Sequence, residues 1–203
     1  KYIFSLGKSG LWEESRPLVM PFLLGIGWKL GFDAVYFGRF VSVLFSILAL
    51  AMVYKIGLKY FSKKIALLAA FFTAFSYTFF FFSPNMLTEV PSLLFVLVAF
   101  YFFAEESFFI AGIFAGLAVI TRFFHLFALF GVLVVLIFYK KRNYRNIFYF
   151  LSGILIFAVP YLMLNYYLYN DALLPFNVQA HLTKTTGWAL YKDSLFYISG
   201  LLK

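Results

Sequence analysis

The chain has 203 residues, of which 64% are hydrophobic and only 12% are charged, and its mean hydropathy is +0.92. A soluble chain draws about 25% of its residues from Asp, Glu, Lys and Arg, so this composition excludes a water-soluble globular domain. Cysteine is absent, which excludes disulfide scaffolds, cysteine-ligated zinc, iron-sulfur clusters and thiol nucleophiles. The net charge of +9 fits either nucleic acid binding or the basic cytoplasmic loops of a membrane protein.

Residues 1–38 predict an extracytoplasmic segment that ends in an interfacial helix. The first sixteen residues lack a sustained apolar core, so a signal peptide is not predicted. Residues 17–32 are apolar but contain Pro21, Lys29 and glycines, which favours a helix that lies along the membrane surface. Because the chain begins at Lys1 rather than Met, we interpret it as an internal piece of a longer protein.

Six apolar segments between residues 39 and 168 predict membrane spans, since a crossing helix needs about 20 mostly apolar residues. The run from 108 to 139 is ambiguous, because one helix of that length would measure about 48 Å and would carry Arg122 and His125 at its middle. It forms either one tilted helix or two short helices that turn between Thr121 and His125. The predicted spans are 39–61, 65–83, 90–104, 108–121, 124–139 and 147–168.

Charge in the loops favours the two-helix alternative. One basic cluster consists of Lys55, Lys59, Lys63 and Lys64, and the other of Lys140, Lys141, Arg142 and Arg145. The positive-inside rule places both on the cytoplasmic face, which requires a hairpin between 108 and 139. The fold class is then an all-α polytopic membrane protein, a bundle of about six transmembrane helices plus an interfacial helix and extracytoplasmic loops. Residues 169–194 predict such a loop, and residues 195–203 the start of a truncated span. Topology accounts for the basic charge, so no nucleic acid partner is expected.

The predicted topology gathers ionisable residues on the extracytoplasmic face. They are Glu13, Glu14, Arg16, Glu89, Arg122, His125 and His181. Charges in or beside membrane spans are costly and are usually functional or paired, so a site is expected on this face. Glu89 falls in a tight loop or in the first turn of a helix, and Arg122 at the tip of the hairpin, which would let the two meet.

Each of these residues also has a structural interpretation that the sequence leaves open. An acidic residue such as Glu89 at a helix start favours the helix dipole. Arg122 can extend its head group to the interface. His125 suits a packing role on an apolar helix, His181 suits an ordinary loop position, and the two N-terminal glutamates suit solvated charges.

The order of several motifs resembles a known family. The motifs are Glu14-Ser15-Arg16-Pro17-Leu18, Gly38-Arg39-Phe40-Val41-Ser42 at the start of a span, a Lys-rich inner turn, Leu87-Thr88-Glu89, and Ala111-Gly112-Ile113-Phe114-Ala115-Gly116-Leu117-Ala118 running to Thr121-Arg122. Over residues 2–190 the chain resembles the C-type (GT-C) glycosyltransferase superfamily, in its protein mannosyltransferase and aminoarabinose transferase branch. It differs in having Arg122 where the family usually has Lys, and a single Pro17 after Arg16.

The resemblance implies an integral protein of the plasma membrane or an endomembrane. It implies transfer of a sugar from a polyprenyl-phosphate-linked donor to a lipid, protein or glycan acceptor on the extracytoplasmic side. Arg16 and Arg122 would bind the donor phosphate, because the planar guanidinium pairs with phosphate oxygens through two hydrogen bonds.

The resemblance also places the family's catalytic acid a few residues before Tyr2. The catalytic residue is therefore expected upstream of Lys1, and the fragment is expected to lack the first transmembrane helix and to be inactive alone. Glu13, Glu14 and Glu89 are candidate helpers. By analogy with some relatives, a divalent metal ion held by His181 and an outer-loop carboxylate is an open alternative.

Two other function classes fit part of the sequence. A secondary transporter also uses charged residues near broken helices, although here the ionisable residues cluster at one face instead of the bilayer centre. A non-catalytic membrane scaffold is the third alternative. Consumption of a lipid-linked sugar without movement of solute would distinguish a transferase from a transporter.

Overall fold

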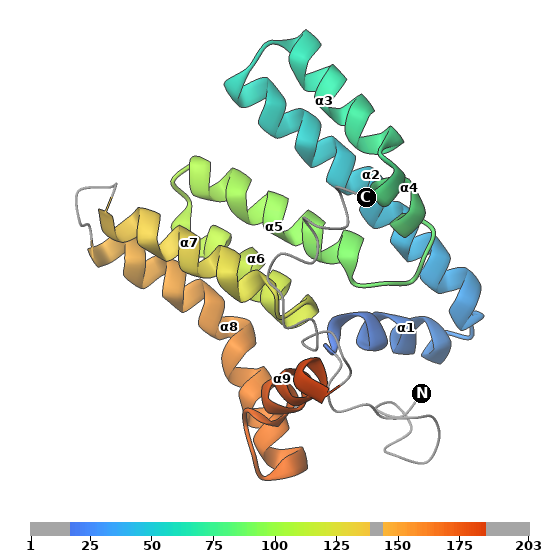
Figure 1. Ribbon diagram of the computed structural model, residues 1–203, viewed down its shortest axis with the longest axis vertical. Helices are drawn as coiled ribbons and strands as arrows, with labels where there is room; N and C mark the ends of the chain where they lie inside the picture. Colours follow the sequence, from blue (N-terminus) through green and yellow to red (C-terminus); the bar gives the residue numbers. More distant parts are fainter. Residues whose placement is uncertain (1–16, 139–143, 186–203) are drawn as a thin grey trace, which may run out of the picture. The chain divides into compact units, whose positions relative to one another are not determined.

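The computed structural model describes residues 17–138 and 144–185, and within those ranges every regular element is an α-helix (Figure 1). The chain forms two compact units, and the described residues divide between them after Tyr161. The helices are α1 (Val19–Lys29), α2 (Ala34–Tyr60), α3 (Lys63–Phe75), α4 (Tyr77–Phe82), α5 (Glu89–Ala104), α6 (Phe108–Thr121), α7 (His125–Phe138), α8 (Tyr144–Tyr169) and α9 (Leu174–Thr185).

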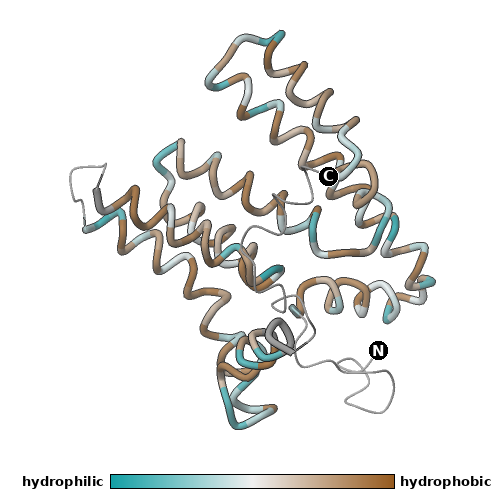
Figure 2. Tube along the Cα trace, viewed as in Figure 1, coloured by the Kyte–Doolittle hydropathy of each residue, from teal (hydrophilic) through white to brown (hydrophobic). Residues whose placement is uncertain are grey.

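Apolar side chains cover the helices on their outward faces as well as their inward ones. Figure 2 shows hydrophobic residues all along the helices and hydrophilic residues mainly at the turns. Phe72 and Phe75 of α3 are 67% and 71% exposed, and Phe127 of α7 is 78% exposed. A soluble protein does not present such aromatic residues to water. The fold is that of a helical membrane protein.

Within residues 17–138 and 144–185, two helices are long and apolar enough to cross a membrane by length and composition, namely α2 with 27 residues and α8 with 26. The helix α8 continues through Pro160. The helices α5, α6 and α7 are apolar but shorter. A bundle of about six spans therefore stays a prediction.

The segment predicted as one span over 65–83 is divided in the structure, so the expectation of a single helix was wrong. The helix α3 ends at Phe75 and α4 begins at Tyr77, because the backbone of Ser76 is extended (ψ 135°). The Ser76 hydroxyl accepts a hydrogen bond from the N–H of Phe79 at 3.4 Å and so caps α4. A capped second helix starts where a continuous helix was expected.

The ambiguous run from 108 to 139 contains two helices. The first, α6, ends at Thr121 and the second, α7, begins at His125, with Arg122 in the connection. The segment predicted as an interfacial helix over 17–32 contains the helix α1, which is shorter at both ends, and its place at the membrane surface stays a prediction. The segment predicted as a loop over 169–194 contains the helix α9, so His181 lies on a helix and the loop assignment was wrong for that residue.

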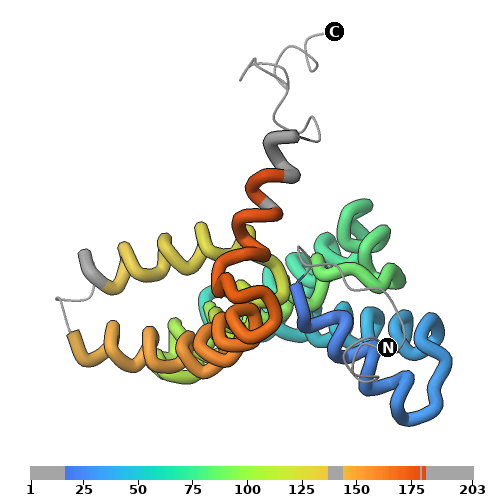
Figure 3. Tube along the Cα trace, turned by 90° about the horizontal axis from the view of Figure 1, so that it is seen from below, coloured from blue at the N-terminus to red at the C-terminus, as the bar shows by residue number. Residues whose placement is uncertain are grey.

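The interior of the first unit is built around α5, which packs against both α2 and α6. One buried cluster joins Ala49 of α2 to Phe79 of α4 and Leu94 of α5. A second cluster joins Phe108 of α6, Leu136 of α7 and Phe150 of α8. The first half of α8 accordingly runs beside α7, as two views show (Figures 1 and 3).

Small residues set the separation between α6 and α8. The sequence predicts close helix packing from the stripe Ala111, Gly112, Ala115 and Gly116, and in the structure a Cβ atom on Gly112 would collide with the backbone carbonyl of Phe150. At Gly116 the same atom would lie 3.0 Å from the carbonyl oxygen of Ile154. The prediction of close packing is confirmed, because the backbone of α6 at Gly112 and Gly116 lies directly against the backbone of α8.

Candidate functional site

The first turn of α5 presents Glu89. Thr88 precedes the helix, and Glu89 is its first residue, where a carboxylate interacts favourably with the helix dipole. The hydroxyl of Ser92 donates to the backbone carbonyl of Glu89 at 2.9 Å. The backbone of Glu89 is therefore held in the helix, and its side chain is placed at the end of α5.

The end of α6 presents Arg122. Thr121 is fully buried, and its hydroxyl donates to the carbonyl of Leu117 at 2.6 Å. Arg122 then leaves the helix with an extended backbone (φ −156°, ψ 114°), while its N–H donates to the carbonyl of Ala118 at 2.9 Å. The N–H of His125 donates to the carbonyl of Arg122 at 3.1 Å, so the connection to α7 is a tight turn.

Glu89 and Arg122 form an ion pair. Nη1 of Arg122 lies 2.8 Å from Oε1 of Glu89, and the two side chains are 27% and 36% exposed, with the arginine the more exposed. The Arg122 guanidinium also lies 5.9 Å from the centre of the Phe124 ring. The antiparallel packing of α5 and α6 brings the start of one helix to the end of the other, which is the meeting that the predicted topology allows.

The contact between the two charges uses one atom of each. Oε2 of Glu89 is buried and has no hydrogen-bond partner among residues 17–138 and 144–185. The ion pair engages Nη1 of Arg122, one of the three guanidinium nitrogens. A guanidinium has five N–H donors, so this arrangement leaves a half-exposed cation that can bind an anion while it remains paired with Glu89.

His125 lies next to this pair at the start of α7. It borders an apolar cavity of about 180 Å³ enclosed by residues of α5, α6 and α7, among them Ala99, Ala118 and Leu129. Its Nε2 atom is buried and makes no hydrogen bond to any residue that the structure describes. The surroundings are those of a packing residue with one unused polar atom.

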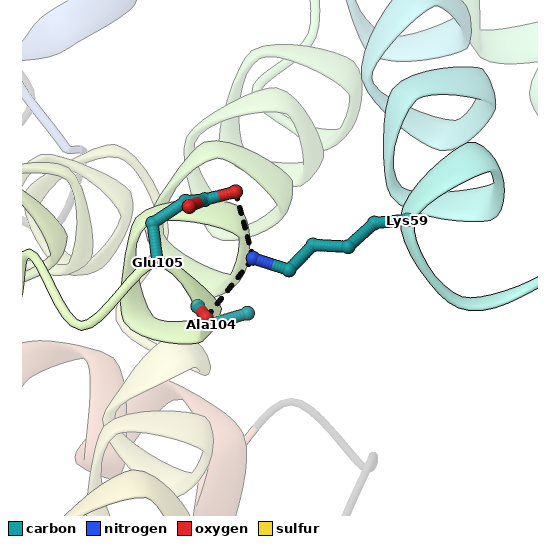
Figure 4. Close-up of polar contacts among 3 residues, drawn as sticks. All are labelled: Lys59, Ala104 and Glu105. Carbon is teal, nitrogen blue, oxygen red and sulfur yellow. Dashed lines mark hydrogen bonds and ion pairs between the residues drawn. The ribbon is translucent and has the colours of Figure 1, made fainter.

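A second ion pair lies at the opposite end of α5, and sequence reasoning missed it. Nζ of Lys59, in the last turn of α2, lies 2.7 Å from Oε1 of Glu105 and donates to the carbonyl of Ala104 at 3.0 Å (Figure 4). The hydrogen bond from Lys59 holds the pKa of the Glu105 carboxyl below its ordinary value. Lys59 lies in the last turn of α2 and Glu105 directly follows α5, and the two helices run in the same direction. Opposite charges at the ends of two spans that cross in the same direction are the sequence signal that could have identified the pair.

The remaining predicted site residues lie outside the described residues or in the second unit. Glu13, Glu14 and Arg16 lie outside the described residues. His181 is an exposed residue of α9 in the second unit. Across the described ranges there is no group of three or more His, Cys, Asp or Glu side chains that could hold a metal ion. A role of His181 as a metal ligand stays a prediction.

Comparison with known proteins identifies the family. The family model described as dolichyl-phosphate-mannose-protein mannosyltransferase matches residues 15–166, about three quarters of the chain. No curated protein and no solved structure matches the chain significantly. The matched range includes the helices that carry Glu89 and Arg122. The chain belongs to the dolichyl-phosphate-mannose-protein mannosyltransferase family, whose members are membrane glycosyltransferases of the GT-C type.

Proposed function

We propose that this chain binds the donor of a sugar transfer that runs from a polyprenyl-phosphate-linked sugar, such as dolichyl-phosphate mannose, to an acceptor hydroxyl on the extracytoplasmic face. The family assignment supports the reaction type. The single structural observation that supports the site is the ion pair of Glu89 with Arg122, which leaves N–H donors of Arg122 for an anion.

The reaction needs positive charge where the donor phosphate departs. The acceptor hydroxyl oxygen forms a bond to the anomeric carbon, the bond from that carbon to the phosphate oxygen breaks, and a carboxylate takes the hydroxyl proton. Negative charge grows on the leaving lipid phosphate, so a preorganised cation there lowers the barrier. In this scheme Arg122 binds the phosphate, and Arg16 supplies a second cation.

Glu89 then acts as a positioning residue. Its Oε1 atom is paired with Nη1 of Arg122, so the side chain holds the guanidinium in place, and the proposal assigns the acceptor proton to another carboxylate. The proton acceptor is expected in the segment before Tyr2, with Glu13 and Glu14 as helpers. No step is assigned to a metal ion.

The test measures sugar transfer from a radiolabelled lipid donor by the full-length protein and its Arg122→Gln variant in liposomes. A lost charge-assisted hydrogen bond costs about 1.5 to 3 kcal/mol, so we expect transfer to slow about ten- to a hundredfold. Arg122→Lys should recover part of the rate, because Lys keeps the charge and loses the two-point geometry.

Arg39→Gln is the matched control. Arg39 is an exposed arginine near the start of α2, and the change removes the same charge without touching the ion pair. We expect Arg39→Gln to keep the wild-type rate. Equal rates for wild type and Arg122→Gln would show that Arg122 does not bind the donor phosphate. Equal slowing by Arg122→Gln and Arg39→Gln would show that the rate depends only on the net charge of the protein. Arg16→Gln is expected to behave like Arg122→Gln.

A further inference from the structure

A wide groove lies at the end of the first unit that is opposite to Glu89 and Arg122. Its volume is about 850 Å³, and it runs between the turn from α5 to α6, the first turn of α6 and the first turns of α8. The helix α6 has 14 residues, so its two ends are separated by about 21 Å. The groove is therefore distinct from the candidate site for the sugar donor.

The groove is amphipathic. Ser107, Arg145 and Asn146 line one part of it, close to the helix ends. Glu106 and Ser152 also line it, and the other lining side chains are apolar or aromatic. Two of these, Phe109 and Phe148, are 43% and 67% exposed. Exposed aromatic residues on a membrane protein face acyl chains. A molecule that fills the groove thus meets polar groups at the interface and apolar walls along the helices.

The sequence that leads into the groove at Arg145 is strongly basic. Four of the six residues from 140 to 145 are Lys or Arg and none is acidic. Arg145 itself lines the groove, and its guanidinium lies 5.5 Å from the centre of the Tyr149 ring, which supports it in that position. Glu106 is the only acidic residue among the described residues that line the groove. The polar end of an occupant is therefore expected to be anionic.

We propose that this groove binds an anionic glycerophospholipid of the surrounding bilayer, with the phosphate at Arg145 and an acyl chain over Phe109 and Phe148. Basic pockets between membrane helices on the side of the positive loops are suited to anionic head groups. The same end of the bundle carries the turn with Lys63 and Lys64, whose charge predicts the cytoplasmic face, where anionic lipids attract Lys and Arg.

The experiment titrates the full-length protein in detergent with phosphatidylglycerol and, separately, with phosphatidylcholine, and measures bound lipid by native mass spectrometry. We expect phosphatidylglycerol to bind at least about fivefold more tightly, the effect of roughly one basic contact. Arg145→Gln should remove most of that preference, and Arg145→Lys should restore part of it. Glu106→Gln should strengthen binding of phosphatidylglycerol, because it removes the carboxylate that lines the groove.

Lys64→Gln is the control, since Lys64 is an exposed residue at the start of α3 and the change removes the same charge away from the groove. Equal loss of binding in Arg145→Gln and Lys64→Gln, or equal affinity for the two lipids, would overturn the assignment. Polyprenyl phosphate serves as a third ligand. We expect Arg145→Gln to leave the binding of polyprenyl phosphate unchanged. If Arg145→Gln weakened the binding of polyprenyl phosphate instead of phosphatidylglycerol, the groove would be a site for the sugar donor. Unchanged thermal unfolding of Arg145→Gln in phosphatidylcholine will show that the variant folds.

Discussion

Glu89 and Arg122 come from the start of α5 and the end of α6, and Oε1 of the first lies 2.8 Å from Nη1 of the second. This is a single contact between the two side chains, because Oε2 of Glu89 is buried without a hydrogen-bond partner in the described part of the chain. A bidentate pair would engage two guanidinium nitrogens with the carboxylate. The single contact fixes Arg122 in place and keeps the rest of its donors available.

A double-mutant cycle can test whether Glu89 acts through Arg122. We expect Glu89→Ala to slow transfer about tenfold, because Arg122 loses the contact that orients it, a loss on the order of 1.4 kcal/mol. Glu89→Gln, which keeps a neutral acceptor oxygen, should slow it less. The double variant Glu89→Ala/Arg122→Gln should be no slower than Arg122→Gln within about twofold. Fully multiplicative effects would mean that the two residues act independently.

Gly112 should tolerate no side chain. A Cβ atom there meets the backbone carbonyl of Phe150, so Gly112→Ala must separate α6 from α8 at a cost of about 1 to 3 kcal/mol. Gly131, in α7, is the matched control, because a Cβ atom added to it would meet no described atom within 4 Å. Gly131→Ala should be neutral or stabilising by up to about 1 kcal/mol, because alanine favours the helix. Thermal unfolding in detergent compares the two, and equal midpoints would contradict the packing argument.

The ion pair at the other end of α5 predicts a dependence of stability on pH. The hydrogen bond from Lys59 lowers the pKa of Glu105 below its ordinary value of 4.5. The contribution of Glu105 to the free energy of unfolding is therefore fully present above that value and is lost as the pH falls through the lower pKa of the folded state. Unfolding midpoints of wild type and Glu105→Gln should differ at pH 7 and converge at acidic pH. A difference that is constant from about pH 7 to about pH 3 would exclude the ionised pair as its source.

Sidedness can be measured with introduced cysteines, since the chain has none of its own. Lys64 lies in the first turn of α3, and Phe124 is 65% exposed in the connection from α6 to α7. We expect Lys64→Cys and Phe124→Cys to react with a membrane-impermeant maleimide from opposite sides of sealed vesicles. Labelling of both from one side would refute the topology on which the extracytoplasmic placement of Arg122 depends.

Loop charges placed Glu89 and Arg122 on one face, where the two could meet, and the structure shows them in contact. The two basic clusters required a turn near Arg122, and the turn places the start of α5 beside the end of α6. The break at Ser76 was not predictable in the same way. A single serine inside an apolar run can also bond back to the carbonyl four residues earlier and leave the helix continuous. Only the tertiary structure decides between these two conformations.

The start of the helix α9 has a sequence pattern that a hydropathy profile does not show. Asp171 accepts a hydrogen bond from the N–H of Leu173 at 2.8 Å, and Pro175 lies in the first turn of the helix that begins at Leu174. An acidic residue followed by proline at a helix start is a common N-terminal pattern. The segment was interpreted as a loop because its polar residues obscure an apolar period.

The short helices around the ion pair have a consequence for the surrounding lipid. The helices α5, α6 and α7 have 16, 14 and 14 residues, so they are about 24, 21 and 21 Å long, whereas the hydrocarbon core of a typical bilayer is about 30 Å thick. Such hydrophobic mismatch is relieved when the bilayer thins locally. With 27 residues, α2 has no such shortfall. The membrane is therefore expected to be indented beside α5, α6 and α7, which would bring the head-group layer closer to the level of Arg122 and shorten the path of a lipid phosphate to its guanidinium.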